Sequence, residues 1–144
     1  MPPTRLIHSS PSGAAASLLA IVLCANGRID ERELDALDRL RAYERVGIAR
    51  DDFLALAQAS LRAIGLPLSR AQGLRLSDRS RVLELQLAVT DPALRLLVCR
   101  LASAVIKADG RVTTDEHLVY TLLLAQWGVT DTMVAHASMR DFSH

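Results

Sequence analysis

One helical-hairpin pattern occurs twice in the sequence. The second copy reads Lys107-Ala-Asp-Gly-Arg-Val-Thr-Thr-Asp-Glu116 and follows an apolar helical stretch. Its Gly110 can end that helix, and Thr113 with Glu116 three positions later forms a capping box that starts the next helix. The first copy lies 83 positions earlier and reads Cys24-Ala-Asn-Gly-Arg-Ile-Asp-Glu-Arg-Glu33. A repeated helix–turn–helix unit predicts an all-α bundle with two pseudo-repeated helical hairpins.

The composition predicts one aliphatic core. A chain of 144 residues fits a single domain. Half of the residues are hydrophobic but only 3% are aromatic, so Leu, Ala, Val and Ile must fill the space between helices. Seventeen basic and sixteen acidic residues give a net charge of +1, which does not predict a nucleic-acid partner. We expect one domain over residues 13–138, a flexible leader over 1–12 and a flexible tail over 139–144.

The first apolar run, Ala14 to Ala25, predicts a structural helix. It follows Arg5 as the core of a signal peptide would, but it is shorter than the roughly 20 residues that span a bilayer. The equivalent run in the second copy, Leu97 to Ala108, lies too far along the chain to direct targeting. Cys24 and Cys99 lie in such runs and are predicted to be reduced core residues. We therefore expect no membrane span and a cytoplasmic protein.

Apolar periodicity and capping residues predict about seven helices. Asp30 and Gly47 mark the two ends of the second helix, Ser77 caps the fourth, and Asp91-Pro92 begins the fifth. Residues 65–76 are expected to form the main internal loop. The predicted helices are 13–25, the segment from Asp30 to Gly47, 51–64, 77–89, 92–107, 114–127 and a short one from about 131.

The fifth helix is predicted to lie at the centre of the bundle. Its wide apolar stripe is interrupted only by basic residues that we place on other faces, namely Arg95, Arg100 and Lys107. The second helix has an outer face of alternating charge, where Asp35 precedes Arg39 by four residues. That face is interpreted as a solvated surface.

The order of these motifs resembles the TerB-like family, which is named for a tellurite-resistance protein. The similarity covers most of the chain, from about Ser12 to Val129. It rests on the doubled hairpin, on Leu76-Ser-Asp-Arg79 and Asp91-Pro-Ala-Leu-Arg95 at helix starts, and on Trp127-Gly-Val129 after the last long helix. The resemblance implies an all-helical domain with an internal two-fold pseudo-repeat, found in stress-response proteins.

The resemblance also implies a metal site, because members of that family are thought to bind divalent cations through acidic side chains near the hairpin turns. Carried over to this chain, the ligands are Asp109 and Glu116 in the second hairpin and Glu33 in the first. The cation would be calcium or zinc, bound weakly. Asn26 departs from the aspartate of the family, since an amide oxygen can coordinate calcium but adds no charge.

Other interpretations of the same residues remain open. The glycine and glutamate spacing matches the second half of an EF-hand loop, but Val105 and Lys107 occupy the first two ligand positions, where an EF-hand has carboxylates. Asp109, Asp115 and Glu116 can simply end one helix and cap the next. His117 is either a packing residue or an added metal ligand, and packing is favoured.

No catalytic motif stands out, so we do not expect an enzyme. The sequence has no Gly-x-Ser-x-Gly elbow, no His-Glu-x-x-His and no phosphate-binding glycine loop. Two functions remain. The first is a TerB-like stress-response domain that binds a divalent metal, and the second is a helical adaptor that binds an unidentified protein partner without metal.

Overall fold

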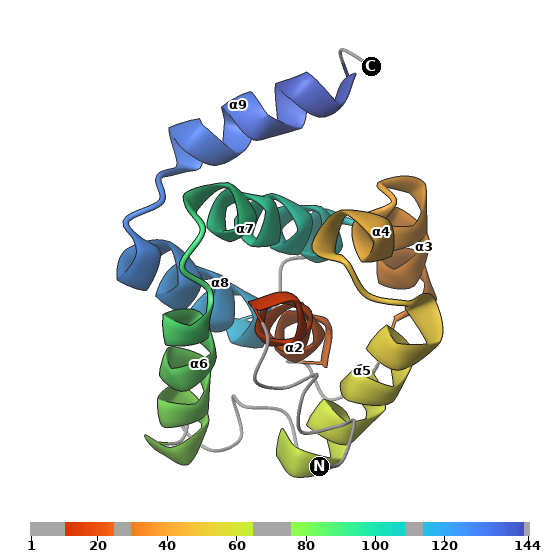
Figure 1. The fold of residues 1–144 in the computed structure, drawn as a ribbon, viewed down its shortest axis with the longest axis vertical. Helices are drawn as coiled ribbons and strands as arrows, with labels where there is room; N and C mark the ends of the chain where they lie inside the picture. Colours follow the sequence, from red (N-terminus) through yellow and green to blue (C-terminus); the bar gives the residue numbers. More distant parts are fainter. Residues whose placement is uncertain (1–10, 25–29, 65–75, 109–113, 143–144) are drawn as a thin grey trace.

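The computed structural model describes residues 11–24, 30–64, 76–108 and 114–142, and all regular secondary structure in these ranges is helical. The prediction of an all-α fold is therefore confirmed for the described residues. The described residues form eight helices, where about seven were predicted, and Figure 1 shows their arrangement. They are α2 (Pro11–Cys24), α3 (Glu31–Arg39), α4 (Ala42–Val46), α5 (Arg50–Ile64), α6 (Leu76–Ala88), α7 (Pro92–Lys107), α8 (Thr114–Trp127) and α9 (Asp131–Phe142).

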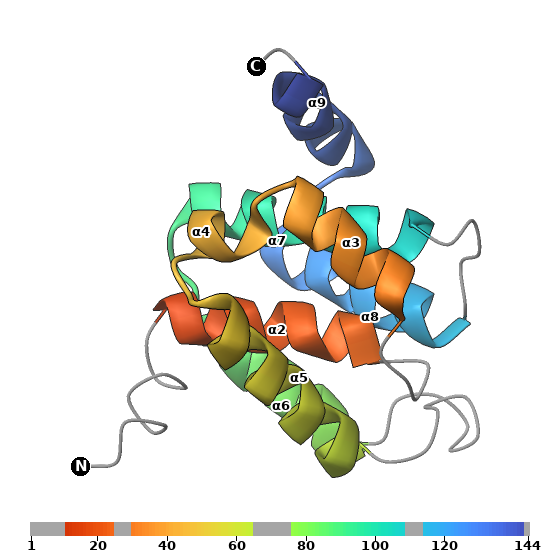
Figure 2. The same cartoon turned by 90° about the vertical axis from the view of Figure 1, so that its right-hand side faces the viewer.

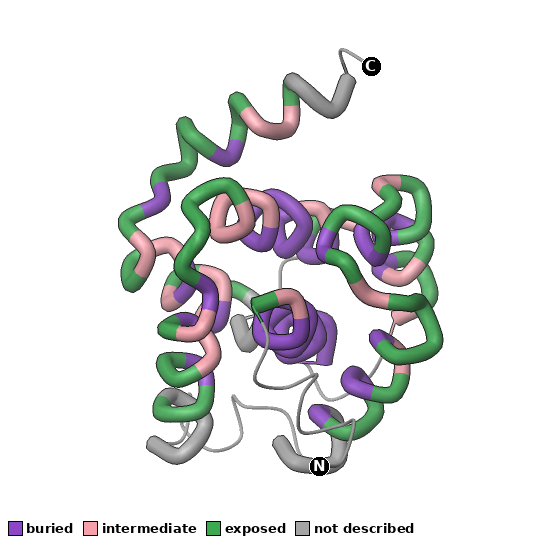
Figure 3. Tube along the Cα trace, in the orientation of Figure 1, coloured by how far each residue is buried: buried purple, intermediate pink, exposed green. Residues whose placement is uncertain are grey.

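Helix α2 lies at the centre of the bundle. Every residue from Gly13 to Cys24 is buried, and α5, α6, α7 and α8 pack around it (Figures 1 and 3). The predicted centre was α7, which is only half-buried from Leu94 to Leu97. The physical reason is charge: α2 has no ionisable side chain apart from the Cys24 thiol, so it can be covered on all sides, whereas α7 carries two arginines and a lysine.

Several helix ends form as the capping residues predict. The Asp30 carboxylate accepts a hydrogen bond from the Arg32 amide at 2.8 Å, and the Asp91 carboxylate accepts one from the Ala93 amide at 3.0 Å. Gly128 ends α8 with a φ of 66°.

Two other ends differ from prediction. Helix α6 begins at Leu76, so Ser77 lies inside the helix and does not precede it. Helix α9 is longer than expected and continues to Phe142, past the predicted domain boundary at residue 138.

The predicted helix from Asp30 to Gly47 is broken into α3 and α4. The Arg41 amide donates to the Asp38 carbonyl in a tightened last turn, and Arg41 itself is left-handed, with φ 55° and ψ 40°. This reversal turns α4 so that its apolar residues enter the core, namely Ala42, Tyr43 and Val46. No glycine or proline marks the break, which is why the sequence pattern did not predict it.

A polar and aromatic cluster holds the α3–α4 corner against α5. The Arg50 guanidinium pairs with the Asp38 carboxylate at 3.1 Å and lies 5.9 Å from the centre of the Tyr43 ring. That ring in turn packs at a tilt on Phe53, with 5.2 Å between ring centres. These contacts fix the corner on α5, and both α3 and α4 also pack on α7 (Figure 2).

A second cluster joins α6, α7 and α8. The Gln86 amide donates to the Leu123 carbonyl at 3.4 Å, and the Trp127 indole donates to the Gln86 carbonyl at 3.2 Å. Arg95 donates to the Val89 carbonyl after α6 at 2.6 Å, and its guanidinium lies 5.8 Å from the Trp127 ring centre. These contacts fix the N-terminal half of α7.

Helix α9 stands apart from the other helices and packs on α7 (Figure 2). Within the described ranges, no single helix has the length and apolar character needed to cross a bilayer. The segments His117–Trp127 and Asp131–Met139 meet that test only as a pair bent by 99°.

The hairpin turns themselves, with Asn26, Gly27 and Gly110, lie outside the described residues. The helices on both sides of each turn are present as predicted. The two-fold relation between the hairpins stays a prediction.

Candidate functional site

Of the three predicted metal ligands, the described structure places one side chain, that of Glu33, so the three-residue site stays a prediction. Glu33 lies in α3 with a fully buried side chain, 0% exposed. Asp109 and the side chain of Glu116 lie outside the described residues. In the part of the chain that is described, no three His, Cys, Asp or Glu side chains gather where a metal ion could be held. His117 is exposed, so it does not occupy the packing position that was favoured for it.

Burial makes both cysteines poor nucleophiles. The Cys24 thiol donates to the Ala57 carbonyl at 3.1 Å. Burial, followed by the nearby Glu33 carboxylate, raises the pKa of Cys24 from 9.0 to about 12. Burial alone raises the pKa of Cys99 to about 12. Both thiols are therefore free, protonated at neutral pH and part of the core, as predicted.

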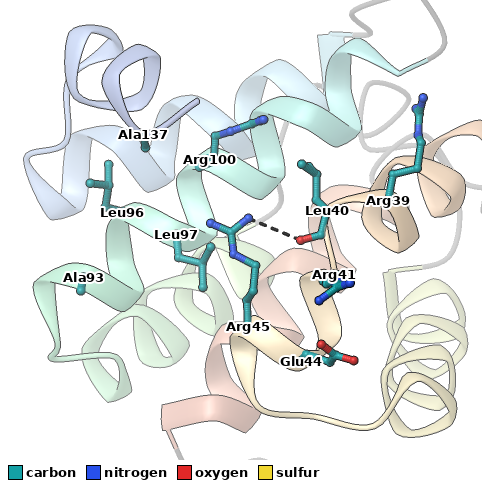
Figure 4. Close-up of a pocket in the computed structure, with 10 residues that line it drawn as sticks. All are labelled: Arg39, Leu40, Arg41, Glu44, Arg45, Ala93, Leu96, Leu97, Arg100 and Ala137. Atoms are coloured by element: carbon teal, nitrogen blue, oxygen red, sulfur yellow. Dashed lines mark hydrogen bonds between the residues drawn. The ribbon is translucent and has the colours of Figure 1, made fainter. Parts of the chain in front are cut away.

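One recess in the described surface is a groove between the α3–α4 corner and helices α7 and α9. We call it the arginine groove, and Figure 4 shows its lining. Its volume is about 910 Å³. Ten residues line it: Arg39, Leu40, Arg41, Glu44, Arg45, Ala93, Leu96, Leu97, Arg100 and Ala137.

The arginine groove concentrates positive charge. Four of its lining residues are arginines and one, Glu44, is acidic, whereas the whole chain carries a net charge of only +1. In Figure 4 the side chain of Arg45 extends from α4 into the space between the corner and α7, whereas the side chain of Arg100 extends from α7 away from Arg45, and Arg39 points away from the groove. Such a lining attracts an anion.

Three of the four arginines come from the α3–α4 corner, and the fourth comes from α7. Arg39 ends α3, Arg41 occupies the left-handed position and Arg45 lies one turn later in α4. The Arg45 guanidinium donates to the Leu40 carbonyl at 3.4 Å, so it also covers the C-terminal end of α3. Arg100 projects from α7 and is only 8% exposed.

The floor of the groove is apolar and comes from α7. Ala93 is exposed, and Leu96 and Leu97 are half-buried. Ala137 of α9 closes one edge (Figure 4). The ten lining residues include no histidine, cysteine or hydroxyl group and only one carboxylate. The arrangement therefore suits the binding of an amphipathic anion better than acid–base or nucleophilic catalysis.

A smaller recess of about 420 Å³ lies further along α3, and its lining contains as many acids as bases: Arg32, Asp35, Asp38, Arg39 and Ala108. Because its charges cancel, it does not concentrate positive charge as the arginine groove does.

Sequence reasoning missed the arginine groove. The outer face of the second predicted helix was interpreted as solvated, and Arg100 was placed on a face of α7 other than the apolar stripe. The sequence did contain one signal, because Arg41 and Arg45 carry like charges at helical i, i+4 spacing. Such a pair destabilises a helix unless another interaction compensates for the repulsion.

Comparison of the chain with family models, with curated proteins and with solved structures finds no match in any of the three. The candidate site therefore rests on its own geometry.

Proposed function

We propose that this chain is a non-enzymatic adaptor domain that binds a protein partner through the arginine groove. The observation that carries the proposal is the gathering of four arginines beside an apolar helix face in a chain of nearly zero net charge. The core packing of α2, α5 and α7 supplies a rigid support for that surface. A rigid scaffold with one charged, partly apolar recess is the usual form of a recognition domain.

The metal-binding function is less well supported by the geometry. Glu33 is fully buried and would have to leave the core to meet a hydrated cation, which prefers several oxygen ligands together with water. For Asp109 and Glu116 the divalent-cation hypothesis stays a prediction. The stress-response role likewise rests on the TerB-like resemblance of the sequence alone.

Site-specific photo-crosslinking in the cells that produce the protein tests the adaptor function. A photoreactive amino acid replaces Ala93, which is exposed on the floor of the groove. The matched control replaces Ser80, which is exposed on α6 and does not line the groove. We expect a protein adduct from position 93 and none from position 80. The absence of any adduct at 93, or the same adducts from both positions, would contradict the proposal.

A further inference from the structure

The floor of the arginine groove has the spacing of a helix-packing face. Ala93, Leu96, Leu97 and Arg100 stand at positions i, i+3, i+4 and i+7 of α7, so they form one stripe. Stripes of this kind pack against another helix in a bundle. Helix α9 packs on α7 and contributes Ala137 to the lining of the groove beside this stripe (Figure 4). The stripe is thus partly uncovered on a helix whose other residues, from Val98 to Ile106, are mostly buried.

The charges beside this stripe define what can cover it. Arg41 and Arg45 stand one helical turn apart along one side of the floor, and Arg100 closes the stripe at its C-terminal end. Guanidinium groups pair with carboxylates through two parallel hydrogen bonds. A complementary surface therefore combines an apolar strip with carboxylates along the flank that faces Arg41 and Arg45.

We propose that the arginine groove receives an acidic amphipathic helix of a partner protein. Its apolar residues pack on Ala93, Leu96 and Leu97, and its carboxylates lie beside the exposed Arg41 and Arg45. This inference rests on the proposed adaptor function and specifies the partner. The stripe spans about 10 Å, or two helical turns, at 1.5 Å per residue. Because that contact is short and partly ionic, its affinity depends strongly on salt.

A helix fits these observations better than the other anionic partners. Nucleic acid is held by charge along its backbone, whereas half of this lining is apolar: Leu40, Ala93, Leu96, Leu97 and Ala137. A flat lipid surface reaches projecting side chains, whereas Leu96 and Leu97 on the floor of the groove are half-buried. Binding of an amphipathic helix in a groove uses the same i, i+3, i+4, i+7 anchors that α7 presents.

Fluorescence anisotropy with designed peptides tests the inference. The probe is a labelled helical peptide of about 18 residues, five turns long, with leucines at i, i+3, i+4 and i+7 and glutamates on the flanks. A second peptide has lysine in place of every glutamate. We expect the full chain to bind the acidic peptide at least about tenfold more tightly than the basic one, and to lose most of that affinity in about 0.5 M salt.

Three variants locate the binding site. Arg45→Glu should lower the affinity for the acidic peptide by about tenfold or more and raise the affinity for the basic peptide, because the charge of this side chain is reversed. Ala93→Trp should block the floor, and its exposed position makes the fold tolerant of the change. Arg81→Glu is the matched control, since Arg81 is exposed on α6 and does not line the groove. It should bind the acidic peptide as the wild type does.

The inference is overturned if the acidic peptide does not bind, if both peptides bind equally, or if Arg45→Glu binds the acidic peptide as well as the wild type does. It is also overturned if sedimentation shows a wild-type dimer that Arg45→Glu abolishes, since the occupant would then be a second copy of this chain. A crosslinked partner at position 93 together with failure of the acidic peptide would leave the adaptor function standing and remove only the acidic helix.

Discussion

Two glycines with left-handed backbone allow the effect of side-chain contact to be separated from the effect of backbone strain. Gly47 ends α4 with φ 91°, and its amide donates to the Tyr43 carbonyl at 2.9 Å. Gly128 ends α8 with φ 66°. A Cβ added at Gly47 would lie 3.1 Å from Ser12 Oγ at the start of α2, whereas one added at Gly128 would meet nothing within 4 Å. Substitution by alanine should therefore affect the two sites differently.

The expected free energies follow from these geometries. At Gly128 an alanine meets only the left-handed backbone penalty, about 1 kcal/mol, because φ 66° lies in the allowed left-handed region. At Gly47 the φ of 91° lies outside that region, and the tight contact with Ser12 adds a packing cost. We expect Gly47→Ala to reduce the free energy of unfolding by about 2–4 kcal/mol.

Urea unfolding followed by Trp127 fluorescence and far-UV circular dichroism measures both variants. The double variant Ser12→Ala, Gly47→Ala isolates the contact, because it removes Ser12 Oγ and leaves the strained backbone. The double variant should unfold with a free energy about 1 kcal/mol higher than that of Gly47→Ala. This difference is the coupling energy that a double-mutant cycle measures for residues in contact. The contact with Ser12 would be refuted if Gly47→Ala and Gly128→Ala reduced the free energy of unfolding equally. It would also be refuted if the double variant were no more stable than Gly47→Ala. No loss at either glycine would refute both assigned backbone conformations.

Two further changes test the metal hypothesis and the left-handed arginine. Glu33→Gln should leave the response of the melting temperature to about 5 mM calcium equal to that of the wild type, because the buried carboxylate is out of reach of a hydrated ion. A smaller response in the variant would restore Glu33 as a ligand. Arg41→Gly should raise the free energy of unfolding by about 0.5–1 kcal/mol, since glycine accepts φ 55° without strain. A destabilised Arg41→Gly in urea unfolding would mean that the arginine side chain stabilises the corner by more than its backbone strain costs.

The features of the fold that could be predicted from sequence are those that local chemistry decides. Asp91 followed by Pro92 permits little except a helix start, and the observed N-cap bond to Ala93 follows from it. Gly128 likewise ends α8 where it was expected, because glycine adopts φ 66° without strain. The buried free state of both cysteines followed from their apolar neighbours.

The break between α3 and α4 could not be predicted, because it is decided by long-range packing. Residues 30–47 contain a good cap at each end and continuous helical spacing, so local rules favour one helix. The chain instead turns at Arg41 so that Tyr43 packs on Phe53 and the Arg50 guanidinium reaches Asp38. Those partners lie on α5, which no pattern within 30–47 can reveal.

The position of α2 shows a related limit of pattern reasoning. Both α2 and α7 read as strongly apolar helices, and the clearer amphipathic stripe favoured α7 as the centre. A stripe, however, implies a second face that meets solvent or a partner, whereas a helix that is apolar all round requires burial on every side. The uncharged α2 therefore takes the centre, and α7 keeps a face from Ala93 to Arg100 that the rest of the described chain covers only in part.

The left-handed backbone of Arg41 connects the fold to the proposed binding surface. Among the described residues it is the non-glycine residue with a positive φ, a conformation that costs an arginine about 1–2 kcal/mol relative to its preferred backbone. The same turn moves α4 toward the core and places Arg41 and Arg45 along the flank of the α7 stripe. A glycine at that position would make the turn with less strain but would remove one of the charges that line the groove. Strained residues of this kind persist where the surrounding structure enforces them, and they concentrate at binding sites. The strain at Arg41 and the partly uncovered stripe of α7 are thus two features that meet at one surface, which is why we propose that the partner binds there.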